Sequence, residues 1–234
     1  MKRIISSAGC LLLSCFVLAG CSGSSDPFAQ KEFTADAAQI GELNIDVRDR
    51  QIDVSLSEDG QIHISYFENS KETYDISVSD DHVLTMTAAG GKDWTDFIGG
   101  KPSAENRKIS LQIPDASLDT LTLSTTNEEI SLPALAVTGS IQISDNGGNI
   151  SFENLDVGNA LQLTAKNGDI SGTVAGSYDD FYIQSKIKKG DSSLPDDKDE
   201  GAKTLLSSRI LISQVSQENT VISSYSQTSS SLSL

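Results

Sequence analysis

A pattern of apolar residues recurs every 20 residues in the middle of the chain, and this fixed interval restricts the fold more than any other feature. One series is Leu121-Thr-Leu123, Ile141-Gln-Ile143 and Leu161-Gln-Leu163. A second series is Ile130-Ser131, Ile150-Ser151 and Ile170-Ser171. One unit holds too few apolar side chains for a core of its own, so successive units must stack and share one interior. The interval predicts an all-β fold, a single-stranded right-handed β-helix or β-solenoid with coils of about 20 residues.

The pattern is looser outside this region. From Ile40 onward, short stretches alternate apolar and polar residues, which is typical of strands buried on one face. Leu43 precedes Ile52 by nine residues, the same offset that separates Leu121 from Ile130. Phe181-x-Ile183 has the form of a fourth unit. A β-sandwich of similar strands is the alternative fold, although it does not explain a constant interval.

The first 20 residues have the layout of a signal peptide. Lys2 and Arg3 precede an apolar stretch that is too short to span a bilayer comfortably. The stretch ends in Leu18-Ala-Gly-Cys21, which resembles the bacterial lipobox, the site where a diacylglycerol is attached to the cysteine thiol. Ser7-Ala-Gly-Cys10 lacks the leading Leu and has little apolar sequence before it, so we reject it. The resemblance implies lipid attachment at Cys21 and an extracytoplasmic location, anchored to the bacterial cell membrane.

Four regions follow from these signals. We expect a lipoprotein signal peptide at 1–20, a flexible tether at 21–36, a β-solenoid domain at 37–212 and a weakly ordered Ser/Gln-rich tail at 213–234. All three cysteines lie at or before position 21, so the solenoid must be stable without disulfides.

The net charge of the chain limits the classes of partner that it can bind. The net charge of −16 becomes −18 once the leader is removed, because the leader carries two basic residues and no acidic one. Such a balance excludes nucleic acid and disfavours anionic membrane surfaces as ligands. The expected partners are the membrane, through the lipid on Cys21, and an envelope protein or glycan.

One column of turn residues is a candidate catalytic site. Glu129, Asn149 and Asp169 occupy equivalent positions, so the two acids would lie roughly 9 to 10 Å apart, two coils from one another. That separation suits an inverting glycosidase. Tight turns demand Asn, Asp and Gly for backbone reasons alone, and this explanation is the stronger one. We therefore expect no catalytic residues.

Other candidate residues have simpler explanations. His63 and His82 lack the spacing of a metal site, and the acidic segments at 80–81 and 196–200 match no known calcium loop, so we expect no metal and no cofactor. The Gly-rich stretch at 88–106 holds Trp94 and Phe97. These two aromatic residues could contact a ligand, but we expect them to cap the end of the apolar column.

The chain resembles the bacterial "putative adhesin" β-strand-repeat family, a domain of unknown function. Members carry units of the form apolar-x-apolar, a polar turn, Asn-Gly-Asp and then Ile. Asn167-Gly-Asp-Ile170 matches this turn, Gly147-Gly-Asn-Ile150 matches in part, and Asn127-Glu-Glu-Ile130 departs at the glycine. The likeness extends from residue 40 to about 205, while the Ser/Gln tail departs from the family's closing coil. It implies a β-solenoid of the cell envelope and no established activity.

These observations favour a non-enzymatic protein, an adhesin-like binding or envelope scaffold module. The competing interpretation is an accessory protein of an envelope-stress response system. A carbohydrate-active β-helix enzyme is the weaker alternative.

Overall fold

The computed structural model describes residues 27–89, 101–186, 194, 197–208 and 219–223. Residues 1–26, with Cys21 and the leader, lie outside this part of the chain, as do Trp94 and Phe97. The strands are β1 (Ala29–Asp36), β2 (Glu42–Asp46), β3 (Gln51–Leu56), β4 (Gln61–Glu68), β5 (Tyr74–Val78), β6 (Val83–Ala88), β7 (Lys108–Ile113), β8 (Thr120–Thr125), β9 (Ile130–Leu132), β10 (Leu135–Val137), β11 (Ser140–Asp145), β12 (Ile150–Val157), β13 (Ala160–Ala165), β14 (Ile170–Ala175), β15 (Phe181–Lys186), β16 (Lys203–Ser208) and β17 (Asn219–Ser223). The 3-10 helices are η1 (Ala37–Gln39), η3 (Glu105–Arg107) and η4 (Tyr178–Asp180).

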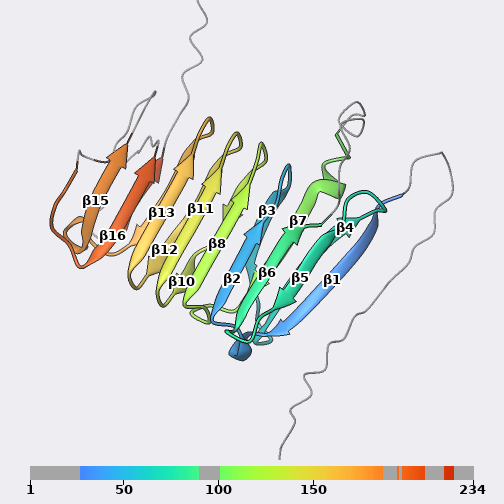
Figure 1. Cartoon of the computed structure of the whole chain (residues 1–234). Helices are drawn as coiled ribbons and strands as arrows, with labels where there is room; N and C mark the ends of the chain where they lie inside the picture. Colours follow the sequence, from blue (N-terminus) through green and yellow to red (C-terminus); the bar gives the residue numbers. More distant parts are fainter. Residues whose placement is uncertain (1–26, 90–100, 187–193, 195–196, 209–218, 224–234) are drawn as a thin grey trace, which may run out of the picture.

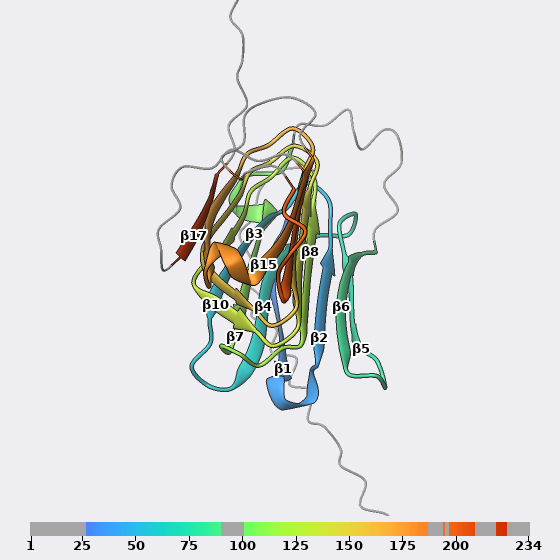
Figure 2. The same ribbon diagram turned by 90° about the vertical axis from the view of Figure 1, so that its left-hand side faces the viewer.

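The strands form two facing sheets that enclose one apolar interior (Figures 1 and 2). Sheet A has the order β1-β4-β7-β3-β9-β12-β14-β17, with β10 beside β12. Sheet B has the order β15-β16-β13-β11-β8-β2-β6-β5. In the middle of the molecule the chain passes from sheet B to sheet A and back in each coil. The fold is therefore a β-solenoid.

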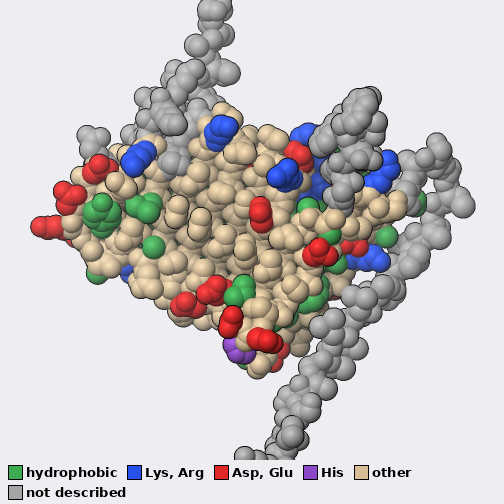
Figure 3. Space-filling model, viewed as in Figure 1, with side chains coloured by type: hydrophobic (Ala, Val, Ile, Leu, Met, Phe, Trp, Pro, Cys, Tyr) green, Lys and Arg blue, Asp and Glu red, His purple; other side chains and the backbone are tan. Residues whose placement is uncertain are grey.

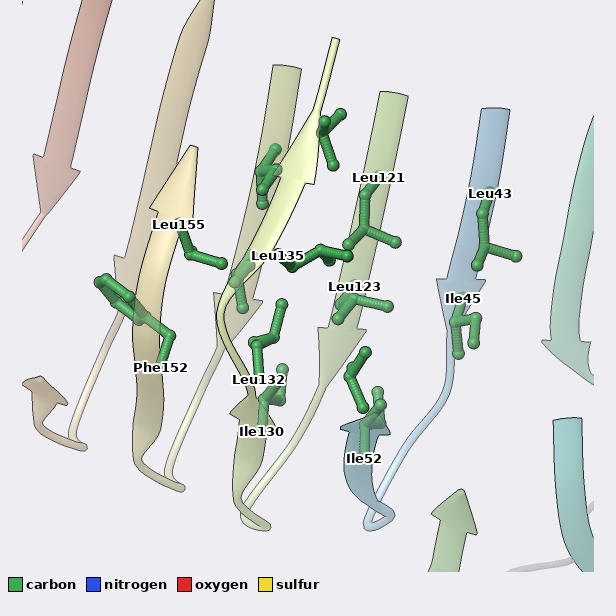
Figure 4. Close-up of a cluster of buried hydrophobic side chains, with 14 of the residues drawn as sticks. Leu43, Ile45, Ile52, Leu121, Leu123, Ile130, Leu132, Leu135, Phe152 and Leu155 are labelled. Carbon is green, nitrogen blue, oxygen red and sulfur yellow. The ribbon is translucent and has the colours of Figure 1, made fainter. Parts of the chain in front are cut away.

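The 20-residue interval is the register of the stack. Leu121 pairs with Ile141, and Ile141 with Leu161, in parallel strands β8, β11 and β13. Ile130, Ile150 and Ile170 align in the same way on sheet A. All six side chains are at most 1% exposed, and Figure 4 shows several of this interior set pointing between the sheets. This parallel ladder confirms the solenoid and rules out the β-sandwich alternative.

The first coil, β2–β3, is inserted between coils that come later in the sequence. β2 lies between β6 and β8, and β3 lies between β7 and β9, all in parallel register. Leu43 aligns with Leu121, and Ile52 with Ile130, as their common nine-residue offset predicts. The looser N-terminal half thus shares the interior of the regular coils.

The C-terminal end departs from the expected order. Phe181-x-Ile183 does not follow β13 as a fourth unit, because β16 lies between β13 and β15. Leu205 of β16 takes the position beside Leu161, and Ile183 lies one strand farther out. The chain skips a place and then returns to fill it.

Two predicted boundaries are wrong. Residues 29–36 belong to β1, which pairs antiparallel with β4, so the solenoid domain begins within the segment assigned to the tether. Residues 219–223 form β17, which pairs antiparallel with β14, so part of the segment assigned to the tail is a strand. Both strands add antiparallel edges to sheet A.

Aromatic side chains close the N-terminal end of the interior. Tyr66 of β4 and Tyr74 of β5 meet edge to face, with ring centroids 5.4 Å apart, and so connect the two sheets. Tyr66 and Phe33 are buried, while Tyr74 is half-buried. A solenoid needs such a cap because its last coil would otherwise expose apolar side chains to water.

Glycines set the spacing at the edge where sheet B strands turn toward sheet A. A Cβ on Gly168 would lie 1.6 Å from the carbonyl oxygen of Gly148, and one on Gly148 would lie 2.0 Å from that of Glu128. Neither distance is sterically possible. The family-like Asn-Gly turn is thus required by the close approach of successive coils.

Candidate functional site

The outer surface of sheet B is the most distinctive surface of the molecule. Every second residue on its strands points away from the interior. On the four neighbouring strands β8, β11, β13 and β16, these residues define what we call the sheet B face: Thr120, Thr122, Ser124, Ser140, Gln142, Ser144, Ala160, Gln162, Thr164, Thr204 and Leu206.

None of these eleven side chains is charged, in a protein with a net charge of −16. Charges return only on the flanking strands, with Glu42 and Asp46 on β2 and Lys186 on β15. Asp145 lies on β11, but its side chain points inward and is 3% exposed. Figure 3 shows this surface as a broad area of uncharged side chains with charges around its margin.

Sheet A has a different outer surface. Asp53 and Lys108 form an ion pair there, and Ser131 donates a hydrogen bond to Asp53. Burial raises the pKa of Asp53, but hydrogen bonds from Lys108, Gln51 and Ser131 outweigh burial and lower the pKa below its usual value. Glu153 adds an exposed acid on β12. The absence of charge from the sheet B face is therefore not a general property of the solenoid.

A groove of about 950 Å³ borders the sheet B face where its strands end. Its lining includes an outward row, one residue from each strand: Thr87, Asp46, Ser124, Ser144 and Thr164. The turns at 47–50, 126–127 and 146, the β4–β5 connection at 71–73, and Tyr74, Ala88, Thr125 and Asp145 form the rest of its wall. We call it the corner groove.

A buried guanidinium holds this wall in place. Arg50 is 4% exposed, pairs with Glu72 and donates hydrogen bonds to the hydroxyl of Tyr74 and the carbonyl of Asp49. Although burial lowers the pKa of Arg50, Coulombic attraction to Tyr74 and Glu72 raises it above the ordinary value. These contacts fasten the β4–β5 connection to the turn after β2.

Asp145 forms the inner side of the groove. Its Oδ1 accepts a hydrogen bond from the backbone N–H of Gly147, 2.9 Å away. Burial raises the pKa of Asp145, and backbone N–H groups of the surrounding turns oppose that shift. The carboxyl group thus caps its own turn in a setting that disfavours its charge.

A second hollow of about 100 Å³ lies on the same surface, lined by Gln162, Thr164, Gln184, Lys186 and Leu206 among others. Thr164 belongs to both hollows. Tyr182 of β15 pairs with Thr204 and points outward in a half-buried position. The two hollows therefore meet at one residue of the sheet B face.

The turn column predicted from the sequence exists, but its side chains form hydrogen bonds that hold successive coils together. The N–H groups of Ile130 and Ile150 donate to the carbonyls of Asn149 and Asp169, which places these turns in consecutive coils. Asn149 Oδ1 accepts from the N–H of Asp169, and Glu129 accepts from the Ser151 hydroxyl. These contacts agree with a structural role for the column.

The histidines occupy separate edges. His63 Nε2 lies 2.9 Å from Asp59, and the Ser57 hydroxyl, the Gln61 N–H and His63 lower the pKa of Asp59 to about 2. His82 lies in a turn with its Nδ1 2.9 Å from the carbonyl of Gln39. Within the described ranges, no three His, Cys, Asp or Glu residues are grouped to hold a metal ion. None of the helices in this part of the chain could span a membrane.

The sequence contains a signal for the sheet B face, although no motif marks it. Gln142, Gln162 and their Ser and Thr neighbours alternate with buried aliphatic residues, and no charged residue takes an outward position in these strands. The corner groove had no comparable signal, because Arg50, Glu72 and Tyr74 come from separate segments.

A family model and two solved structures are similar to this chain. The family model described as Toastrack DUF4097 matches residues 40–194. Among solved structures, a "putative cell adhesion protein" from Clostridium sporogenes ATCC 15579 is similar at 9% identity and a TM-score of 0.44, over 78% of this chain and 93% of that one. A "putative adhesin" from Parabacteroides distasonis ATCC 8503 is similar at 14% identity and a TM-score of 0.30, over 78% of this chain and 97% of that one. No curated protein matches.

Proposed function

This chain belongs to the Toastrack family, DUF4097, and on that premise we propose that it is a lipid-anchored binding module of the bacterial cell envelope. The lipid on Cys21 holds the solenoid at the membrane surface, outside the cytosol. The sheet B face meets the partner. The module binds without chemical conversion of its ligand.

The observation that carries this proposal is the uncharged sheet B face with a hollow at its margin. Folding requires only the inward residues of these strands, so the interior does not account for eleven uncharged outward side chains. Charged residues at such positions would keep an acidic protein soluble at least as well. A surface from which charge is excluded is typical of the central part of an interface.

Binding is tested with the full-length protein and host envelope fragments. We expect the protein to sediment with the fragments, and a Thr122→Glu/Gln142→Glu variant to lose most of this binding, since a bound partner would have to desolvate two new charges. Ser171→Glu, an exposed outward position on sheet A, is the matched control. Equal binding by all three proteins would refute a role for the sheet B face.

Anchoring is tested separately. Cys21→Ser should abolish incorporation of a labelled fatty acid and release the protein from membranes, whereas Cys10→Ser should leave both unchanged. Labelling that persists in Cys21→Ser would contradict the assignment of the anchor.

A further inference from the structure

We propose that the ligand of the sheet B face is an extended, uncharged carbohydrate polymer that lies across the strands, along the axis of the solenoid. This inference rests on the proposed binding function and names the class of ligand. Its support comes from charge, from hydrogen-bonding chemistry and from the shape of the surface.

Charge excludes the alternatives first. A polyanion would find no cation on the face itself; it would meet one cation, Lys186, at one margin and two acids, Glu42 and Asp46, at the other. A polycation would be attracted to the acids elsewhere on the molecule, because the face offers it no ion pair. A neutral ligand is the class that gains most from a surface without charge, since it leaves no charged group desolvated and unpaired.

The hydrogen-bonding groups suit a polyhydroxylated ligand. Gln142 and Gln162 are exposed and stand side by side on β11 and β13, and Gln184 on β15 continues the same row beyond Leu206 of β16. Each amide offers two donors and an acceptor, and the flanking hydroxyls can donate and accept. Sugar hydroxyls need partners of both kinds.

The row also repeats at a fixed distance. Adjacent strands are about 4.8 Å apart, so Thr122, Gln142 and Gln162 present hydrogen-bonding groups at that interval, and Gln184 resumes the row after Leu206. A polymer with a repeating unit can place successive hydroxyls against successive strands. A compact ligand would use only one or two of these positions.

Strand propensity does not explain this composition. Thr at outward positions is common because its branched side chain suits a strand. Gln is not among the residues that strands favour, and yet it occupies the central outward position of β11, β13 and β15. Gln61 and Gln112 also point outward, on sheet A, but they are not register partners, so the alignment of Gln142 with Gln162 is what calls for an explanation beyond the sheet itself.

The shape of the surface supports the same class of ligand. The corner groove and the second hollow share one lining residue, Thr164, and the second hollow is lined by Gln162 and Gln184 of the row. Tyr182 lies beside Thr204 on the outermost strand of the same sheet, in a half-buried outward position. Figure 3 shows a small hydrophobic group at the left margin of the face. An aromatic ring beside hydrogen-bonding groups can stack against the apolar face of a sugar ring.

The experiment measures retention of the full-length protein, in detergent micelles, in gels that contain one polymer. The neutral probes are a β-1,4-glucan, a β-1,4-linked N-acetylglucosamine polymer and dextran, and the charged probes are polygalacturonate and polylysine. We expect retardation by at least one neutral polymer, unchanged at high salt. Gln142→Ala/Gln162→Ala should weaken it at least tenfold, while Gln61→Ala/Gln112→Ala, at exposed outward positions on sheet A, should not.

Two results would overturn the inference. One is retardation by the charged polymers alone. The other is equal retention of the two double variants. Treatment of the envelope fragments separates this failure from failure of the proposed function. Binding that survives periodate oxidation of glycans but not protease digestion would assign a protein partner, which keeps the binding function and refutes the carbohydrate. Binding lost only on oxidation supports the inference.

Discussion

The middle coils and the two ends of this solenoid are built by different rules. In the middle, β8, β11 and β13 follow one another in sequence and in space, with a constant interval of 20 residues. At both ends the order of the strands in the sheet departs from their order in sequence, as β2 lies between β6 and β8 and β16 lies between β13 and β15. The middle coils are aligned by the repeated sequence, whereas the ends depend on contacts between particular side chains.

The largest expected effect breaks the repetition itself. Gly168→Ala should destabilise the protein by roughly 3 to 4 kcal/mol, because its Cβ would collide with the backbone of the preceding coil. Gly41→Ala is the control, since a Cβ there meets nothing within 4 Å. Urea unfolding followed by circular dichroism measures both. A Gly168→Ala protein as stable as the control would show that the coils can separate freely.

The next effect concerns the N-terminal end. Tyr66→Ala should cost about 2 to 3 kcal/mol, since it removes a buried ring that joins the two sheets. Tyr66→Phe keeps the ring and should cost much less. If unfolding is cooperative, both variants will shift the whole transition. A separate early transition in Tyr66→Ala would instead identify the end as an independent unit.

A smaller effect is expected at the wall of the corner groove. Glu72→Gln leaves the buried Arg50 with a neutral partner and should cost about 2 kcal/mol. Thermal unfolding in low and high salt measures it, and the loss should persist in salt because the pair is shielded from solvent. Lys108→Gln removes a more exposed ion pair with Asp53 and should cost less than about 1 kcal/mol. Equal losses would show that burial of Arg50 does not matter.

The smallest effect is a change in pH dependence. Burial raises the pKa of Asp145, so its carboxyl contributes most to stability in acid, and this contribution is lost as pH rises through the folded-state pKa. Asp145→Asn cannot ionise and keeps an acceptor for the Gly147 N–H. The stability of Asp145→Asn relative to the wild type should therefore increase as pH rises. Unfolding across a pH series measures this change.

Asp59→Asn should change the pH dependence of stability in the opposite direction. The pKa of Asp59 is lowered to about 2, so its stabilising contribution is present above the unfolded pKa and is lost as pH falls. The stability of Asp59→Asn relative to the wild type should therefore decrease as pH rises. The same direction in both variants would contradict the assigned shifts.

The sequence predicts the middle of the molecule well and the ends poorly, for a physical reason. Ile141 and Leu161 reveal their contact through a constant spacing, because neighbours in sequence are neighbours in space. Leu205 has no such spacing to Leu161, since a long connection precedes β16, and Phe181 has the right form in the wrong place. The strand β1 could not be distinguished from a tether, because Phe33 is its one buried residue.

The candidate site shows the same division. The sheet B face can be read from alternation once the strands are known, since Gln142 and Gln162 must point opposite to their aliphatic neighbours. The pairing of Arg50 with Glu72 and Tyr74 cannot be predicted from the sequence, because it depends on how the β4–β5 connection folds back.

The insertion of β2–β3 between later coils determines when this protein can begin to fold. A chain that emerges from a ribosome or a membrane pore with its N-terminus first exposes β2 long before β6 and β8, and must pass residue 125 before both neighbours of β2 exist. The first parallel partner of β2, which is β6, is complete only at residue 88 and the second only at residue 125, and closing such distant contacts is slow. For a protein exported as proposed, this delay keeps the polypeptide open during translocation. The order of assembly thus favours passage through the membrane first and compaction afterwards.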